Sequence, residues 1–170
     1  MSYASLSEFI DKLTSVNEII VINDPVNVKL EITEIVDRFS KSTDNNKALL
    51  FTNTGTKFPV LINAMGSDSR MALALNVDSL EALSSSVSHV VESILSKPEG
   101  FMGKLRKMPQ IAQLGRWMPK RISGKGKCQE QVLDVVDLGA LPILQCWPLD
   151  GGPFITLPSV HTIDPISVAS

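Results

Sequence analysis

Apolar residues in the first half of the chain follow the spacing of amphipathic helices. A helix is predicted over residues 6–13, where apolar positions recur at i, i+3, i+4 and i+7. Ser5 and Glu8 stand three residues apart at its start, which is the spacing of a capping box. The same periodicity predicts a second helix over 32–39, and a short helix is predicted over 71–75.

The predicted helices alternate with short apolar runs. Three of these runs predict strands, at 19–22, 48–51 and 60–62, and the strand at 48–51 is expected to be buried. A longer helix is predicted over 80–94, led by Asp78 and Glu81 at a second capping-box spacing. Helices that alternate with a few short strands predict an α/β layered fold.

This pattern divides the chain into three parts. Residues 1–97 are predicted to form a small N-terminal α/β domain, and residues 98–130 a basic connector broken by proline and glycine. Apolar stretches at 131–136 and about 154–163 predict further strands. These strands are expected to begin a second domain over residues 131–170.

The net charge of −2 conceals an uneven distribution along the chain. Residues 1–96 carry 7 basic and 12 acidic residues, residues 97–127 carry 9 and 1, and residues 128–170 carry 0 and 5. The three parts therefore have charges of −5, +8 and −5. The basic part could bind nucleic acid or an anionic cofactor, but its aromatic rings are limited to Phe101 and Trp117, and it contains no known nucleic-acid motif. A solvated connector is favoured, and no nucleic-acid partner is expected.

The environment of the protein is also indicated by the sequence. No apolar run approaches the ~20 residues of a membrane-spanning helix. Residues 1–5 lack the basic and apolar segments of a secretory signal. Cys128 and Cys146 have no metal-type spacing. These features predict a soluble cytoplasmic protein with reduced thiols and no transmembrane segment.

Two polar segments could bind an anion, and each has a simpler interpretation. Gly124–Lys127 lacks the spacing of a phosphate loop, so a surface linker is favoured. Residues 63–70 lie between a predicted strand and a helix whose free amides could hold a phosphate. Capping of that helix by Ser67, Asp68 or Ser69 is favoured over a phosphate site.

Isolated acidic and nucleophilic residues complete the candidates. Three acidic residues recur at i, i+3 and i+6 on the predicted second helix, namely Glu31, Glu34 and Asp37. They could gather on one flank, although a solvated helix face is favoured. His89 is expected at the surface or boundary of its helix. His161 lies in the last predicted strand, and a lone histidine without a carboxylate partner at metal-ligand spacing favours a structural role. Cys146 could act as a nucleophile only beside a base that the sequence does not reveal.

The run 141–158 shapes its backbone more strongly than any other part of the chain. It contains four prolines, at positions 142, 148, 153 and 158. Gly151 and Gly152 permit backbone angles that side chains forbid, while the prolines fix φ and remove amide donors. Such a run is typical of a site or a tight domain junction.

These residues resemble UbiD-type carboxy-lyases, the decarboxylases of ubiquinone and menaquinone biosynthesis and their relatives. The strongest resemblance lies in Cys146-Trp147-Pro148 and Asp150-Gly151-Gly152-Pro153-Phe154-Ile155-Thr156, with Asp164-Pro165 after them. Residues 117–130 look most like the subgroup of menaquinone biosynthesis. Weaker resemblances lie at 30–38, 48–51 and 59–63.

The resemblance implies a multi-domain enzyme that is longer than this chain. A small α/β domain would precede a split β-barrel related to flavin reductases, followed by a C-terminal domain. The implied cofactor is prenylated FMN, held with Mn²⁺ and often K⁺. The flavin would serve as an electron sink while an aromatic or unsaturated carboxylic acid loses CO2. A homo-oligomer is also expected.

Carried over residue by residue, the resemblance assigns one cofactor-binding position, Thr156, which resembles a strand threonine near the flavin. A barrel-strand residue without ligand contact is the alternative. No catalytic and no metal-binding residue can be carried over, because the family's Asn-x-Gly-x-Tyr-Arg-like segment has no counterpart after Asp164-Pro165.

Two expectations follow for the chain as a whole. Residues 131–170 are expected to be the first strands of an incomplete, truncated flavin-binding barrel, so the chain alone is predicted to be inactive. The alternative is a non-catalytic interaction module, or a truncated paralogue that associates with full-length subunits.

Overall fold

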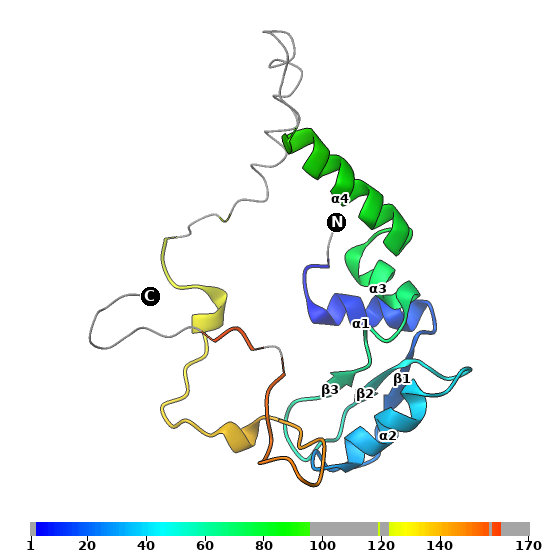
Figure 1. The fold of residues 1–170 in the computed structure, drawn as a ribbon. Helices are drawn as coiled ribbons and strands as arrows, with labels where there is room; N and C mark the ends of the chain where they lie inside the picture. The colour runs from blue at the N-terminus through cyan, green and yellow to red at the C-terminus, as the bar shows by residue number, and fades with distance from the viewer. Residues whose placement is uncertain (1–2, 96–118, 120–122, 157, 161–170) are drawn as a thin grey trace, which may run out of the picture. The chain divides into compact units, whose positions relative to one another are not determined.

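The computed structural model of the protein describes residues 3–95, 119, 123–156 and 158–160 (Figure 1). The chain divides into two compact units, one formed by residues 1–78 and 137–170 and the other by residues 79–136. The domain boundaries predicted after residues 97 and 130 stay predictions, since most of the predicted connector lies outside the described residues.

The first unit contains a three-stranded sheet in the order β1-β2-β3 (Figure 1). Its strands are β1 (Ile19–Ile22), β2 (Ala48–Phe51) and β3 (Val60–Ile62). β1 and β2 are parallel, so the chain must cross over between them, and helix α2 (Glu31–Ser40) lies in that crossover. β2 and β3 are antiparallel. All three predicted strands are confirmed.

Two further helices belong to this unit. Helix α1 (Leu6–Ser15) begins where predicted, because the Oγ of Ser5 accepts the backbone N–H of Glu8 at 3.3 Å. Helix α3 (Asp68–Leu75) begins three residues earlier than the predicted 71–75 helix and ends at Asn76 in the left-handed conformation. The helices and the sheet confirm the predicted mixed α/β class of the N-terminal part.

Two hydrophobic clusters fill the two faces of this sheet. Side chains alternate across a strand, so neighbouring residues of β2 belong to different clusters. The first cluster joins α1 to the sheet and is made of Phe9, Leu13, Ile19 and Ala48. The second joins α2 to the sheet and is made of Val26, Ile32, Leu49 and Phe51. Helices α1 and α2 therefore cover opposite faces, as a layered α/β fold requires.

The second unit contains helix α4 (Leu80–Leu95). Its start differs by one residue from the capping box predicted at Asp78 and Glu81. The Oγ of Ser79 accepts the backbone N–H of Ala82 at 3.1 Å, so Ser79 caps the helix. The prediction of the helix itself is confirmed.

The strands predicted at 131–136 and 154–163 are not found among the described residues. Residues 131–136 and 154–156 lie in bends and irregular backbone, and the side chains of Val132 and Val136 are 76% and 84% exposed. A strand needs a neighbour to satisfy its backbone groups, and neither segment has one within the described part of the chain. Residues 161–163 lie outside the described residues. The split β-barrel flavin domain stays a prediction.

Candidate functional site

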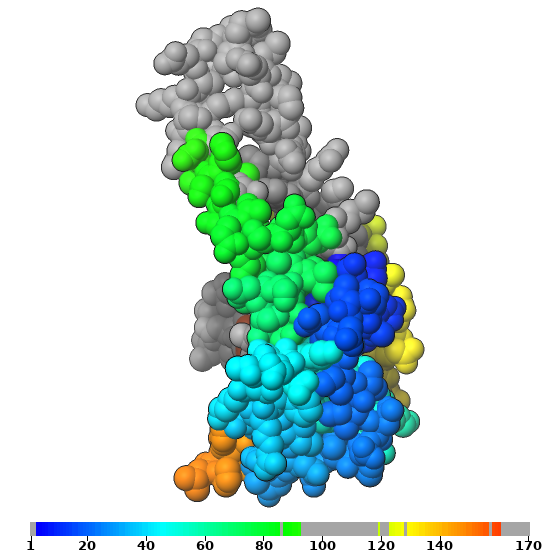
Figure 2. Space-filling view, turned by 90° about the vertical axis from the view of Figure 1, so that its right-hand side faces the viewer, coloured from blue at the N-terminus to red at the C-terminus, as the bar shows by residue number. Residues whose placement is uncertain are grey.

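Residues 143–150 return to the first unit and pack against the start of α2. The N–H of Gln145 donates to the carbonyl of Val28 at 3.2 Å, and the carbonyl of Gln145 accepts the N–H of Leu30 at 2.9 Å. These two bonds form a parallel bridge with Lys29 at its centre. Figures 1 and 2 both show this part of the chain, in orange, beside α2 in cyan.

The backbone at Leu30 takes an unusual conformation to make this contact. Leu30 has φ 70° and ψ −39°, and the N–H of Glu31 donates to the carbonyl of Lys29 at 2.9 Å. This is a γ-turn with positive φ, a conformation that costs a non-glycine residue about 1–3 kcal/mol. The side chain of Asn27 supports the turn by accepting the N–H of Lys29 at 2.8 Å. The carbonyl of Leu30 then accepts the N–H of Glu34 at 3.0 Å and starts α2.

The chain after the bridge is held in a tight turn. The N–H of Trp147 donates to Oδ2 of Asp150 at 2.8 Å, and the N–H of Asp150 donates to the carbonyl of Trp147 at 3.2 Å. Gly152 comes next with φ 144°, which favours glycine. The N–H of Phe154 then donates to the carbonyl of Leu144 at 3.1 Å. Leu144 itself packs against the Ile32 cluster, so the turn is anchored in the core.

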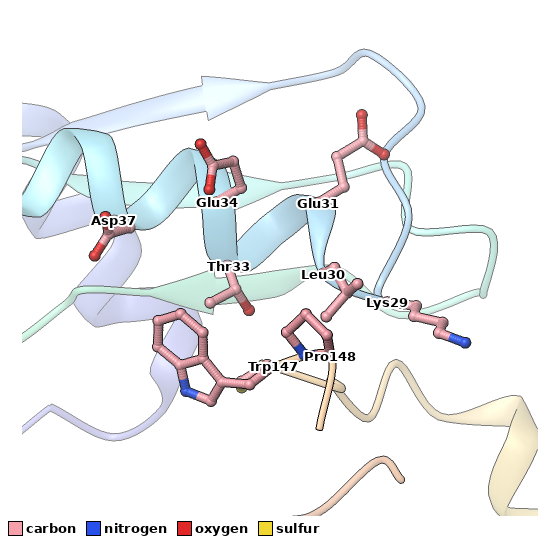
Figure 3. Close-up of a pocket in the computed structure, with 9 residues that line it drawn as sticks. Lys29, Leu30, Glu31, Thr33, Glu34, Asp37, Trp147 and Pro148 are labelled. Carbon is pink, nitrogen blue, oxygen red and sulfur yellow. The ribbon is translucent and has the colours of Figure 1, made fainter. Parts of the chain in front are cut away.

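A pocket of about 540 Å³ lies between this turn and α2. It is lined by Lys29, Leu30, Glu31, Thr33, Glu34, Asp37, Cys146, Trp147 and Pro148. Figure 3 shows Trp147 and Pro148 opposite Thr33 and Leu30. The Oγ1 of Thr33 is buried and has no hydrogen-bond partner among the described residues, whereas the Trp147 side chain is 59% exposed. Although several of its residues are polar, the surface of the pocket itself is mostly apolar.

The three acidic residues of α2 line this pocket but do not converge on it. Glu34 pairs with Arg38 and Asp37 with Lys41, both at 2.7 Å and with exposed side chains. Oε2 of Glu31 accepts a backbone N–H in the preceding loop at 2.7 Å. In Figure 3 the carboxylates of Glu31 and Glu34 point away from Trp147. The favoured interpretation, a solvated helix face, is confirmed.

The segment 63–70 caps its own helix and holds a buried arginine. The Oγ of Ser67 accepts the N–H of Arg70 at 3.2 Å, which confirms the predicted capping of this helix. Arg70 is buried, and its Nη1 donates to Oε2 of Glu18 at 2.8 Å and to the carbonyl of Asn46 at 2.6 Å. The Nδ2 of Asn63 donates to Oδ1 of Asn46 at 2.8 Å and joins the same network. Arg70 is therefore engaged within the fold.

The other predicted site residues are dispersed. Thr156 is exposed in a bend and does not line the pocket, and its role beside a flavin stays a prediction. Cys146 is partly buried at the pocket. His89 is exposed on α4, as expected, and His161 lies outside the described residues. Gly124–Lys127 is largely exposed and runs into a short 3-10 helix.

The described part of the chain offers neither a clustered metal site nor a membrane-spanning helix. Within it, no three histidine, cysteine, aspartate or glutamate side chains lie close enough together to hold a metal ion. In the same residues, no helix combines the length and the apolar character needed to cross a membrane.

Two features of this region have weak or no signals in the sequence. The positive φ of Leu30 has none, because leucine does not favour that conformation. The burial of Arg70 also cannot be predicted from the local sequence pattern, since its partner Glu18 lies 52 residues away. The cluster of proline and glycine around Trp147 does indicate a shaped segment, but it does not reveal that α2 is its partner.

The first unit is thus a small α/β fold against which the later segment 143–150 packs. The 3-octaprenyl-4-hydroxybenzoate carboxy-lyase N-terminal domain (UbiD_N) matches residues 10–88. The Rift-related domain of the same carboxy-lyase (UbiD) matches residues 120–169. The two matches stand in order and together take in most of the chain, which therefore belongs to the UbiD carboxy-lyase family.

Two relatives extend this comparison. An uncharacterized protein of Aquifex aeolicus is 39% identical over 167 residues, which cover 97% of this chain and 34% of the relative. An uncharacterized protein of Archaeoglobus fulgidus is 38% identical over 166 residues, which cover 97% of this chain and 33% of the relative. The chain thus spans about a third of the length of these relatives.

Proposed function

We propose that this chain forms the N-terminal part of a UbiD-type non-oxidative decarboxylase. The substrate class is an aromatic or unsaturated carboxylic acid, and the pathway is quinone synthesis, with menaquinone favoured over ubiquinone. The observation that carries the proposal is that the two UbiD domain models match in order, at residues 10–88 and 120–169. The packing of residues 143–150 on α2 supports it, because it joins the two matched parts physically.

The cofactor implied by the family is prenylated FMN with Mn²⁺. The described residues do not form a site for it by themselves. They contain no metal-binding cluster, and Thr156, though exposed and open to a ligand, stands outside the pocket. No chemical step is therefore assigned to the described residues. Their proposed role is structural: they form the N-terminal fold and hold the start of the Rift-related segment.

A chimera tests the proposal. Residues 1–170 would replace the matched third of the Aquifex aeolicus relative, and both proteins would be supplied with prenylated FMN and Mn²⁺. We expect both to release CO2 from the same aromatic acids, while the 170-residue chain alone releases none. A chimera that folds but stays inactive beside an active parent would contradict the proposal, as would CO2 release by the isolated chain.

A second candidate function is a non-catalytic module that associates with longer subunits. The observation that favours it is a run of exposed apolar side chains, with Leu133 at 74% and Val135 at 78% exposure. Exposed apolar surface of this kind is typical of association sites. In this case the chain would co-elute with the Aquifex aeolicus relative in size-exclusion chromatography. Elution as two independent peaks would exclude this module function.

A further inference from the structure

Residues 28–30 and Gln145 are joined by specific backbone hydrogen bonds as well as by proximity. The contact consists of two backbone hydrogen bonds, at 2.9 and 3.2 Å, between residues more than a hundred positions apart in the sequence. These two bonds involve only backbone groups, so they do not depend on the identity of the side chains. Leu30, which donates one of these bonds, has a positive φ, a strained conformation that persists only where its surroundings hold it.

Apolar packing holds the same segment from the other side. Leu144 packs against the buried cluster that includes Ile32 and Phe51. Opposite it, Trp147 and Pro148 face Leu30 across the pocket (Figure 3). Backbone bonds, core packing and the strained turn thus act on the same few residues.

The anchored segment also positions the residues after Gly152. The carbonyl of Leu144 accepts the N–H of Phe154 at 3.1 Å, which ties this later part of the chain back to the anchor. Thr156 stands two residues beyond that bond. Phe154 is therefore tied through Leu144 to the α/β fold, and Thr156 follows it closely along the chain.

We propose that Leu30, Leu144 and Gln145 form a latch by which the N-terminal α/β fold sets the starting position of the Rift-related segment. Leu144 provides the apolar anchor, and Gln145 and Leu30 provide the backbone bonds. The latch is a property of the fold and holds whether or not the chain contributes to decarboxylation. It makes Leu30, Leu144 and Gln145 positioning residues for whatever Thr156 contacts.

Two leucines of the same segment give a matched pair of variants. Leu144→Ser places a hydroxyl against the core cluster, whereas Leu149→Ser alters a side chain that is 99% exposed. Nitroxide labels at Asp11→Cys, exposed on α1, and Thr156→Cys would report the distance between the fold and the segment. The labels require a background of Cys128→Ser and Cys146→Ser.

The expected result is a narrow distance distribution in the parent and in Leu149→Ser, and a distribution at least about twice as wide in Leu144→Ser. Hydrogen exchange of the Leu30 and Gln145 amides should rise at least about tenfold in Leu144→Ser alone. Equal widths and equal exchange in the two variants would overturn the latch. Neither measurement involves flavin, so a failure of the proposed decarboxylase function would leave this result intact.

A second variant, measured together with the folding of the sheet, distinguishes loss of the latch from unfolding of the whole unit. Gln145→Pro removes the N–H that donates to Val28 and retains the leucine side chain at position 144. Protection of the β2 amides reports whether the sheet is still folded. With β2 protected, a widened distribution in Gln145→Pro would support the latch, and an unchanged one would overturn it.

Discussion

Nη1 of Arg70 donates to Oε2 of Glu18 at 2.8 Å, across an ion pair whose two members differ sharply in burial. The side chain of Arg70 is 1% exposed and that of Glu18 is 36% exposed. Arg70 also donates to the carbonyl and to Oδ1 of Asn46, at 2.6 and 3.2 Å. The pair thereby joins the residue before β1, the loop before β2 and helix α3.

Because Arg70 is far more buried than Glu18, removing Glu18 should destabilise the protein more than removing Arg70. Glu18→Ala leaves a buried guanidinium without its counter-charge and should cost about 3–5 kcal/mol. Arg70→Met leaves a carboxylate that water can reach and should cost about 1–3 kcal/mol. The double variant should be more stable than Glu18→Ala alone. Urea unfolding measures the stability of the two single variants and the double variant. The exposed pair Glu34–Arg38 offers a control, since Glu34→Ala should cost less than about 1 kcal/mol. Equal costs for Glu18→Ala and Arg70→Met would contradict the prediction.

Gly66 is required for a close approach to the same network. A Cβ at this position would lie 2.0 Å from Oδ1 of Asn63 and 3.0 Å from Nη2 of Arg70. The Asn63 side chain is held by its own hydrogen bonds and cannot easily turn aside. Gly66→Ala should therefore cost about 1–3 kcal/mol in unfolding free energy.

Gly151→Ala is the matched control for Gly66→Ala. A Cβ at Gly151 would meet no atom of the described residues within 4 Å, and its φ is not positive. Its unfolding free energy should change by less than about 1 kcal/mol. Thermal or urea unfolding that ranks Gly151→Ala as the more harmful of the two would refute this account.

The start of helix α4 should respond to pH. The pKa of Glu81 lies below its usual value of 4.5, first because its carboxylate accepts its own backbone N–H and second because Ser79 bonds to it. The folded state therefore favours the ionised form. This contribution is complete above pH 4.5 and is lost as the pH falls through the lowered pKa.

Amide exchange in the first turn of α4 measures this effect. Protection should fall as the pH is lowered below 4.5, after correction for intrinsic exchange. Glu81→Gln should show weaker protection at neutral pH and little further loss on acidification. A first turn whose protection is the same at both pH values in the parent protein would show that this ionisation does not support the helix.

Amide hydrogen exchange should be slow where the chain is buried and fast where it is exposed. The amides of β2, whose residues Ala48, Leu49 and Phe51 are fully buried, should be the slowest. Residues 131–136, with side chains such as Val136 at 84% exposure, should exchange at near-intrinsic rates. Mass-spectrometric exchange on the intact chain measures both regions. Slow exchange at 131–136 would indicate that these residues pair with another strand in solution.

Sequence pattern predicts the N-terminal part well because its signals are local. Capping by Ser5, the apolar spacing of α1 and α2 and the three short strands all depend on neighbours within a few residues. The pattern fails at 131–136, where an apolar run meets the local criteria of a strand but no described segment pairs with it. At the start of α4, Asp78 and Ser79 are both suitable capping residues, and only the structure shows that Ser79 caps the helix.

By itself, the sequence determined the alternation of helices and strands, the uneven charge and the proline-glycine run that resembles UbiD carboxy-lyases. Those features depend on residue types and on spacing along the chain. Only the tertiary structure decided that Gln145 bonds to the backbone of residues 28 and 30, and that Arg70 is buried against Glu18. Both contacts join residues far apart in the sequence, and backbone bonds and long-range burial leave no periodic signal in it.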